Sequence, residues 1–137
     1  MSKPPVNRGE VYLVKENAIQ FPKERLPGTP PPHRHQQRPV VVLQCDEDNH
    51  DQTYHIILVA PISSRADLKK QQDFLARAGE AGLRTDSIIM LGLIQPVLRQ
   101  DLEENCLGRF SPARMTEITA MLLCNLGVFP RPAISRR

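Results

Sequence analysis

The 137-residue chain contains no tryptophan, and aromatic residues make up only 4% of it. An extensive base-stacking surface is therefore excluded, which leaves Tyr12 and Phe21 as the N-terminal candidates for stacking on a nucleic-acid base. Of these, Tyr12 is expected to pack in the interior. The chain has three cysteines, an odd number, and no two of them have CxxC spacing. The sequence therefore predicts neither a disulfide framework nor a zinc site. We expect all three thiols to be buried, at Cys45, Cys106 and Cys124.

Long apolar runs are also missing. No segment approaches the roughly 20 apolar residues of a membrane span, and residues 1–5 lack the apolar centre of a signal peptide. We therefore expect a soluble, cytoplasmic protein. The net charge of +3 accommodates a polyanionic partner without requiring one. The acidic run 46–49 lacks the glycine and the distal glutamate of a calcium loop, so we interpret it as a solvated turn and expect no metal.

Proline, in contrast, is abundant at 13 residues, most of them in the first 40 positions and near the C-terminus. We predict a flexible tail at 1–8, a single folded domain at 9–128 and a basic tail at 129–137. Within the domain, the prolines between 22 and 32 exclude regular structure from most of residues 15–37. Such a long loop is typically functional or disordered.

Apolar periodicity predicts a β-rich domain. The expected strands are, by residue number, 9–14, 38–45, 54–62, 86–94, 95–98 and 106–109. Good helix formers at 66–78 predict a helix there on local propensity alone. The fold class is α+β: a small curled sheet or barrel capped by a helix.

The clearest helix is the last, at about residues 112–126. Ser111 is a good N-cap, Pro112 suits the first turn, and Gly127 follows the final turn. One apolar stripe repeats at spacings of three and four and is expected to face the sheet; it consists of Met115, Ile118, Leu122 and Leu126.

The order of five motifs resembles the MazF/PemK family of toxin endoribonucleases. These motifs are RGEVY at 8–12, RPVVVLQ at 38–44, VAPISS at 59–64, GLRTDSII at 82–89 and LGRFS at 107–111. Together they span about residues 8–128. The resemblance implies a small SH3-like barrel of about five to seven strands with a C-terminal helix. It also implies a strand at 73–77, in place of the helix that local propensity predicts.

The resemblance further implies the toxin of a type II toxin-antitoxin pair that cleaves single-stranded RNA, often messenger RNA, without metal or cofactor. Its implied partners are a cognate acidic antitoxin and a second copy of the chain. Arg38 falls on the arginine held to stabilise charge on the scissile phosphate, and Ser63 on the hydroxyl residue that completes the site. Attack by the RNA 2′-hydroxyl builds negative charge that these two donors can meet. Ser64 and Gln95 are expected to support the site or bind RNA.

The loop before Arg38 carries His33, Arg34 and His35. An imidazole beside a phosphate could act as general acid or base, and the basic loop could cover RNA. The alternative for this segment is a solvated loop without a catalytic role. Arg38 itself could be a surface arginine paired with an acidic turn, and Ser63 could simply satisfy backbone groups at a strand end.

Family members commonly carry Gln-Ile-Arg where this chain has Leu-Ile-Gln at 93–95. Because an expected polar pair is lost there, two other functions stay open. One is a non-catalytic, CcdB-like toxin that binds a gyrase-type protein target. The other is an inactive relative that only binds nucleic acid.

Overall fold

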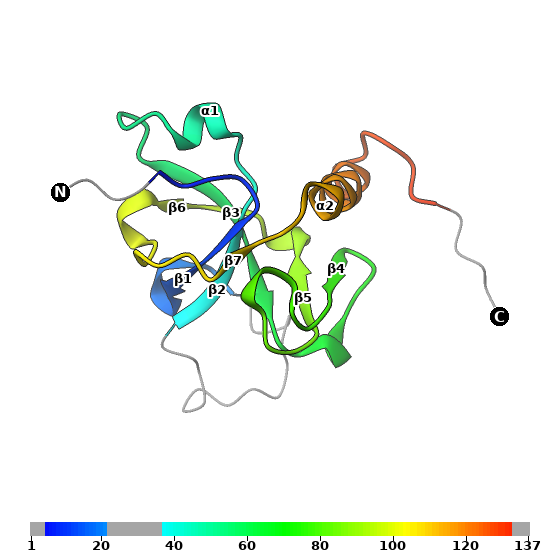
Figure 1. The fold of residues 1–137 in the computed structure, drawn as a ribbon. Helices are drawn as coiled ribbons and strands as arrows, with labels where there is room; N and C mark the ends of the chain where they lie inside the picture. The colour runs from blue at the N-terminus through cyan, green and yellow to red at the C-terminus, as the bar shows by residue number, and fades with distance from the viewer. Residues whose placement is uncertain (1–4, 22–36, 133–137) are drawn as a thin grey trace.

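The computed structural model describes residues 5–21 and 37–132 (Figure 1). The strands are β1 Glu10–Lys15, β2 Gln37–Val42, β3 Ile56–Ser63, β4 Asp73–Ala76, β5 Ser87–Met90, β6 Gln95–Leu98 and β7 Gly108–Arg109. The helices are α1 Asp46–Asn49 and α2 Pro112–Asn125, and the 3₁₀ turns are η1 Glu16–Ala18, η4 Ala66–Leu68, η5 Glu80–Gly82, η6 Leu91–Leu93 and η7 Arg99–Asp101. The predicted β-rich α+β class with a C-terminal helix is confirmed.

All strand pairs are antiparallel, in the order β4-β5-β3-β2-β1-β7, with β6 also paired to β3. The long strand β3 changes partner along its length. Its first half, 56–59, pairs with β6, whereas Ile62 and Ser63 pair with β5. This switch curls the sheet, so that β4 and β5 stand apart from the other strands in the ribbon view (Figure 1).

Both faces of the central strands are buried, which explains their continuous apolar sequence. In β2, Val41 belongs to the core between the sheet and α2. Val40 and Val42 point the opposite way, into a second core that the curled sheet encloses. Tyr12 packs in that second core, as predicted, and its hydroxyl donates a 2.9 Å hydrogen bond to Glu10.

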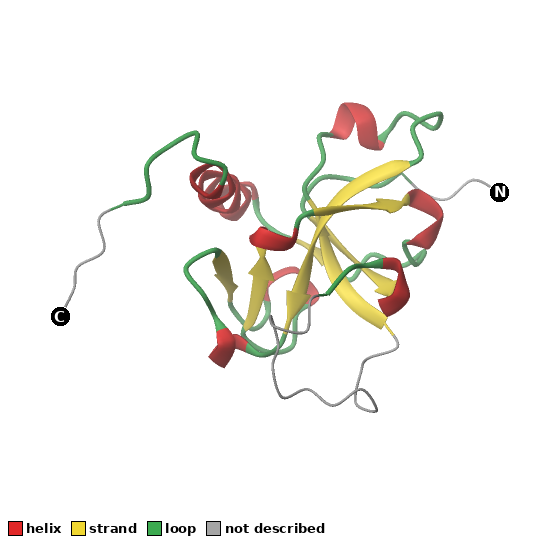
Figure 2. Cartoon of the chain, turned by 180° about the vertical axis from the view of Figure 1, so that it is seen from behind, coloured by secondary structure: helices red, strands yellow, loops and turns green. Residues whose placement is uncertain are grey.

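Helix α2 forms where capping and periodicity predict it, and it lies to one side of the curled strands (Figure 2). The Ser111 hydroxyl accepts a 3.2 Å hydrogen bond from the Arg114 N–H. Met115 and Ile118 are buried against the sheet. The prediction that Leu126 continues this stripe is wrong: the helix ends at Asn125, and Leu126 is 65% exposed.

The helix predicted at 66–78 is wrong, and the strand at 73–77 implied by the family is confirmed as β4. Only residues 66–68 form a helical turn, η4. Phe74 and Ala76 are buried in the core and pair with β5, so tertiary contacts override local helix propensity.

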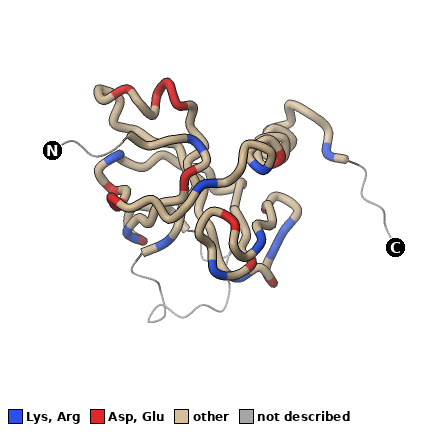
Figure 3. The backbone as a smooth tube through the Cα atoms, in the orientation of Figure 1, with Lys and Arg blue, Asp and Glu red and all other residues tan. Residues whose placement is uncertain are grey.

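Residues 46–49 form the single helical turn α1, whose acidic residues lie together at one end of the molecule (Figure 3). The interpretation as a solvated turn is wrong for Asn49, which is fully buried. Its amide donates to the Gln44 carbonyl at 2.9 Å and to the Asp46 carboxylate at 3.0 Å. These bonds explain why a polar residue is tolerated there.

The prediction that the thiols are buried is also wrong, because Cys45 and Cys106 are exposed and Cys124 is intermediate. Cys45 precedes α1 and Cys106 lies in the turn before β7, so neither belongs to the strands that form the cores. Within the described parts of the chain, no helix has the length and apolar character needed to span a membrane.

Candidate functional site

Arg38 lies near the start of β2, on the face of the sheet that carries the enclosed core. It pairs across the sheet with Val14 of β1. Side chains alternate along a strand, so Arg38 shares its face with Val40 and Val42. It is only 6% exposed. The RPVVVLQ motif therefore places a charged guanidinium at the rim of an apolar core.

Ser63 ends β3 and is buried. The pairing of β2 with β3 ends at Val40 and Pro61, and Arg38 and Ser63 each lie two residues beyond this last pair, at the same end of the two strands. Alternation along β3 also puts Ser63 on the same face as Arg38. The Ser63 hydroxyl accepts a 3.1 Å hydrogen bond from the Arg65 N–H, which leaves its own proton as a donor. Ser64 is exposed beyond the strand end.

Two residues that were not predicted to contact Arg38 hold its guanidinium. Its centre lies 4.2 Å from the centroid of the Phe21 ring, a cation–π contact. Its Nη2 lies 3.4 Å from the Glu16 carboxylate. Phe21 was a stacking candidate on composition, whereas no sequence signal marked Glu16, 22 positions before Arg38. The pairing of β1 with β2 brings Glu16 to the site.

The Nε–H of Arg38 is buried and has no hydrogen-bond partner within the described residues. Buried polar groups are nearly always paired, and an unpaired donor costs about 1–3 kcal/mol. A guanidinium with an unused donor at a sheet rim is suited to an anionic ligand with several acceptor oxygens, such as a phosphate.

Gln95 lies on the same face of the sheet and holds the segment that covers Arg38. Its Oε1 accepts a 2.6 Å bond from the Gln20 N–H, and its Nε2 donates a 3.0 Å bond to the Gln20 carbonyl. Nε2 also donates to the Leu93 carbonyl at 3.0 Å. Because Gln20 precedes Phe21, the Gln95 amide supports the ring that packs on Arg38. A direct contact of Gln95 with RNA stays a prediction.

His33, Arg34 and His35 lie outside the described residues, so the structure does not place them relative to Arg38. Among the described residues, Lys15 is the basic residue closest to Arg38 in the pairing of β1 with β2, because it pairs with Gln37. Lys15 is exposed. Figure 3 shows further basic positions spread over the sheet and α2.

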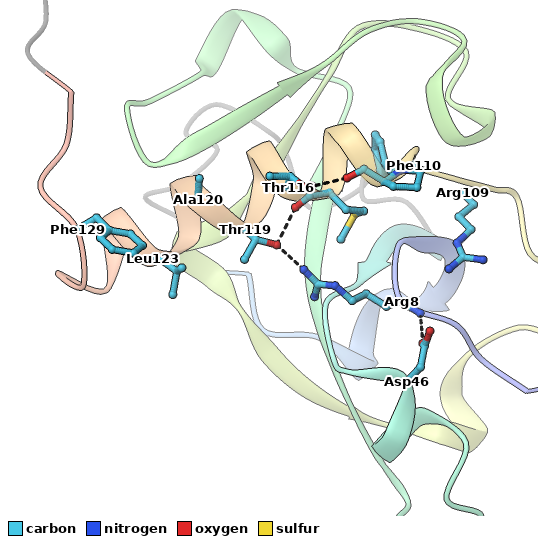
Figure 4. Close-up of a pocket in the computed structure, with 11 residues that line it drawn as sticks. Arg8, Asp46, Arg109, Phe110, Thr116, Thr119, Ala120, Leu123 and Phe129 are labelled. Atoms are coloured by element: carbon cyan, nitrogen blue, oxygen red, sulfur yellow. Dashed lines mark hydrogen bonds between the residues drawn. The ribbon is translucent and has the colours of Figure 1, made fainter.

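A separate groove of about 520 Å³ lies along α2, between the helix and the N-terminal motif (Figure 4). Arg8 spans it: one end of its guanidinium donates to the Leu43 carbonyl and the other to the Thr119 hydroxyl. The Arg8 N–H donates to the Asp46 carboxylate at 2.6 Å. Burial opposes charge on Asp46, but the bonds from Arg8 and Asn49 outweigh it and hold the pKa of Asp46 below its usual range. The first motif thus ties α1 and α2 to the sheet.

Comparison with known proteins places these features in a family. A family model of PemK-like, MazF-like toxins of type II toxin-antitoxin systems matches residues 7–125. A search of curated proteins gives no match.

Solved structures share the fold. A mycobacterial endoribonuclease in complex with its cognate antitoxin has a TM-score of 0.63 at 17% identity and covers 96% of this chain and 100% of its own. A MazE-MazF complex from Deinococcus radiodurans has a TM-score of 0.64 at 14% identity, covering 90% of this chain and 97% of that one. The Mycobacterium tuberculosis toxin MazF-mt6 has a TM-score of 0.63 at 14% identity, covering 86% and 96%.

Proposed function

The chain belongs to the PemK-like, MazF-like family of toxins of type II toxin-antitoxin systems, and we propose that it cleaves single-stranded RNA at the site around Arg38. The observation that carries this proposal is the buried Arg38 guanidinium, whose Nε–H has no partner among the residues that the structure describes. The Nε–H of Arg99 is also buried and unpaired within the described residues, but Arg99 donates four hydrogen bonds to backbone carbonyls from its other nitrogens. The Arg38 guanidinium has only the ion pair to Glu16 as a polar contact among the described residues, so we infer that a further acceptor arrives with the substrate.

In the proposed reaction, the RNA 2′-hydroxyl attacks the adjacent phosphate and displaces the 5′-oxygen. Negative charge accumulates on the non-bridging oxygens as the phosphorane forms. Arg38 donates charge-assisted hydrogen bonds to these oxygens, and the Ser63 hydroxyl donates one more hydrogen bond from the neighbouring strand. Because both side chains are buried at strand ends, they are held in place before the substrate binds. The proposed chemistry needs no metal.

The test is incubation of the purified protein with a long single-stranded RNA in EDTA, followed by mapping of the ends. Arg38→Ala is the test variant, and Arg77→Ala is the matched control because Arg77 is an exposed arginine paired with Asp86. We expect discrete cuts from the wild type and from Arg77→Ala, and none from Arg38→Ala. Cuts that persist in Arg38→Ala contradict the proposed site.

Intact RNA with the wild type contradicts cleavage altogether. It would favour a toxin that acts by binding a protein target, or an inactive relative that binds nucleic acid. Toxicity that survives Arg38→Ala would favour the protein-binding toxin over the inactive relative.

We also propose that an acidic antitoxin binds this toxin in the cytoplasm. Two observations support this pairing: the net charge of +3, and the antitoxin complexes formed by proteins of the same fold. Co-expression with the acidic product of an adjacent short reading frame should yield a stable complex and suppress RNA cleavage. Separate elution of the two proteins would contradict the pairing.

A homodimer is the further proposed assembly. Three large apolar side chains are exposed at and just beyond the C-terminal end of α2: Leu126, Val128 and Phe129. Contiguous exposed apolar residues of this kind typically mark an interface. Light scattering should give twice the chain mass for the wild type and the monomer mass for Leu126→Glu. A monomeric wild type at micromolar concentration would contradict the dimer.

A further inference from the structure

The site around Arg38 and Ser63 contains no group that can accept a proton at neutral pH if only those two residues are counted. An arginine stays protonated, and a serine hydroxyl is a poor base. Attack by a 2′-hydroxyl nevertheless requires that its proton be removed. A further side chain must therefore complete the site.

We propose that Glu16 is the general base that accepts the proton of the attacking 2′-hydroxyl. This inference rests on the proposed ribonuclease function. Glu16 lies 3.4 Å from Arg38 Nη2, so a phosphate bound by the guanidinium is adjacent to its carboxylate. A base must lie within hydrogen-bond reach of the proton it takes, and this position satisfies that requirement for a ribose attached to the same phosphate.

Burial supports the same role. The Arg38 side chain is 7% exposed and the Glu16 side chain 20%. The carboxylate is thus the more solvent-accessible member of the pair. Its backbone is held in η1 by a 3.3 Å hydrogen bond from the Ile19 N–H, and Ile19 is buried in the enclosed core. The turn therefore fixes the base relative to the arginine.

The step balances as follows in atoms and electrons. The 2′-oxygen forms a bond to phosphorus while its proton passes to a carboxylate oxygen of Glu16. The bond from phosphorus to the 5′-oxygen breaks, and that oxygen keeps the electron pair and takes a proton from water. The hydroxide left behind recovers the proton from Glu16. The products are a 2′,3′-cyclic phosphate and a 5′-hydroxyl end.

Charged side chains near Glu16 come from both paired strands. Arg38 faces Glu16 from β2, and Lys15 precedes it on β1. Another carboxylate at this end of the sheet is Glu103, which accepts a 2.8 Å hydrogen bond from Gln37. Glu103 is hydrogen-bonded to Gln37, the residue before Arg38, and not to the Arg38 guanidinium. Glu103 is therefore the matched control.

The decisive variant is Glu16→Gln. Its amide oxygen still accepts a hydrogen bond from Arg38, so the guanidinium keeps its position, but the amide is not a base. Two readouts are compared: kcat for an RNA oligonucleotide across one mapped cut, and Kd for the same oligonucleotide with a 2′-deoxy sugar at the attacking position. Thermal unfolding followed by circular dichroism checks that each variant is folded.

We expect kcat of Glu16→Gln to fall by about 100- to 10,000-fold, the usual range for a general base. Kd for the deoxy probe should stay within about threefold of wild type, since the phosphate contacts remain. The wild-type rate should decline toward acid pH, and this decline should be absent in Glu16→Gln. Glu103→Gln should match wild type in both readouts.

Three results would overturn the role of Glu16. They are a Glu16→Gln rate within about threefold of wild type, a loss of rate matched by an equal loss of probe binding, and an acid-side decline that disappears in His33→Ala/His35→Ala instead. A wild type that binds the deoxy probe but cuts no RNA refutes the proposed function itself. The two failures are therefore distinguishable.

Discussion

Arg38 and Arg114 form a natural pair for testing whether an arginine serves function or structure. Both guanidinium groups pack on a phenylalanine ring, Arg38 on Phe21 at 4.2 Å and Arg114 on Phe74 at 4.6 Å. Their polar contacts differ. Within residues 5–21 and 37–132, Arg38 has one ion pair at 3.4 Å, and its Nε–H has no partner.

Arg114, in contrast, donates from all three of its guanidinium nitrogens. It donates to the Glu80 carboxylate from Nε at 2.6 Å and from Nη2 at 3.1 Å. It also donates to the Leu75 carbonyl at 2.9 Å and to Glu117 at 2.5 Å. These bonds tie α2 to β4 and η5.

Replacement of each arginine by methionine keeps the apolar stem and removes the charge. Arg38→Met loses a cation–π contact of about 0.5–1 kcal/mol and a partly buried ion pair of about 0–1 kcal/mol. It also removes an unpaired buried donor that costs about 1–3 kcal/mol. These contributions nearly cancel, so we expect the free energy of unfolding to change by less than about 1 kcal/mol. RNA cleavage should be abolished.

Arg114→Met leaves the Glu80 carboxylate and the Leu75 carbonyl without their donor. We expect a loss of about 2–4 kcal/mol, because breaking a partly buried pair strands its partner. Urea denaturation followed by far-UV circular dichroism, with m-values compared, measures both variants. A loss of about 3 kcal/mol or more in Arg38→Met would refute the reasoning, because it would show that Arg38 is held for structure.

Two further predictions concern the fold around η5. Gly82 has φ +78° and a Cβ there would lie 2.1 Å from the Leu107 carbonyl oxygen, whereas Gly79 has φ +94° and open space. Each alanine variant should lose about 1–2 kcal/mol of unfolding free energy to left-handed backbone strain. Gly82→Ala should lose clearly more than this, because its Cβ also meets the Leu107 carbonyl. Urea denaturation measures both variants, and equal losses would contradict the clash. Burial opposes charge on Glu80, but bonds from Arg114 outweigh it and lower its pKa below the ordinary 4.5. Because the folded-state pKa is lowered, the ionised Glu80 stabilises the fold at pH values above its unfolded pKa, and this stabilisation is lost as the pH falls. The difference in unfolding free energy between wild type and Glu80→Gln should therefore shrink below about pH 4.5. A constant difference would contradict this.

Much of the fold was predictable from local sequence because its signals are local. Helix α2 begins after Ser111, since a hydroxyl there caps the first turn in any context. The apolar run at 38–45 predicts a strand, and β2 forms there with side chains in both cores. The ordered motifs predicted the family, and the family model confirms it. Arg38 and Ser63 were also chosen from these motifs, and their catalytic roles stay predictions.

The remaining features depend on contacts between distant segments. Residues 73–76 favour a helix locally, yet pairing with β5 and burial of Phe74 make them a strand. Glu16 carries no signal of its own, and it reaches Arg38 only because β1 and β2 pair in one register. The sequence by itself thus determined which segments are apolar, capped or family-like, because propensity and periodicity act over a few residues. Only the tertiary structure decided which side chains share the site, because strand register and burial are set by the whole sheet.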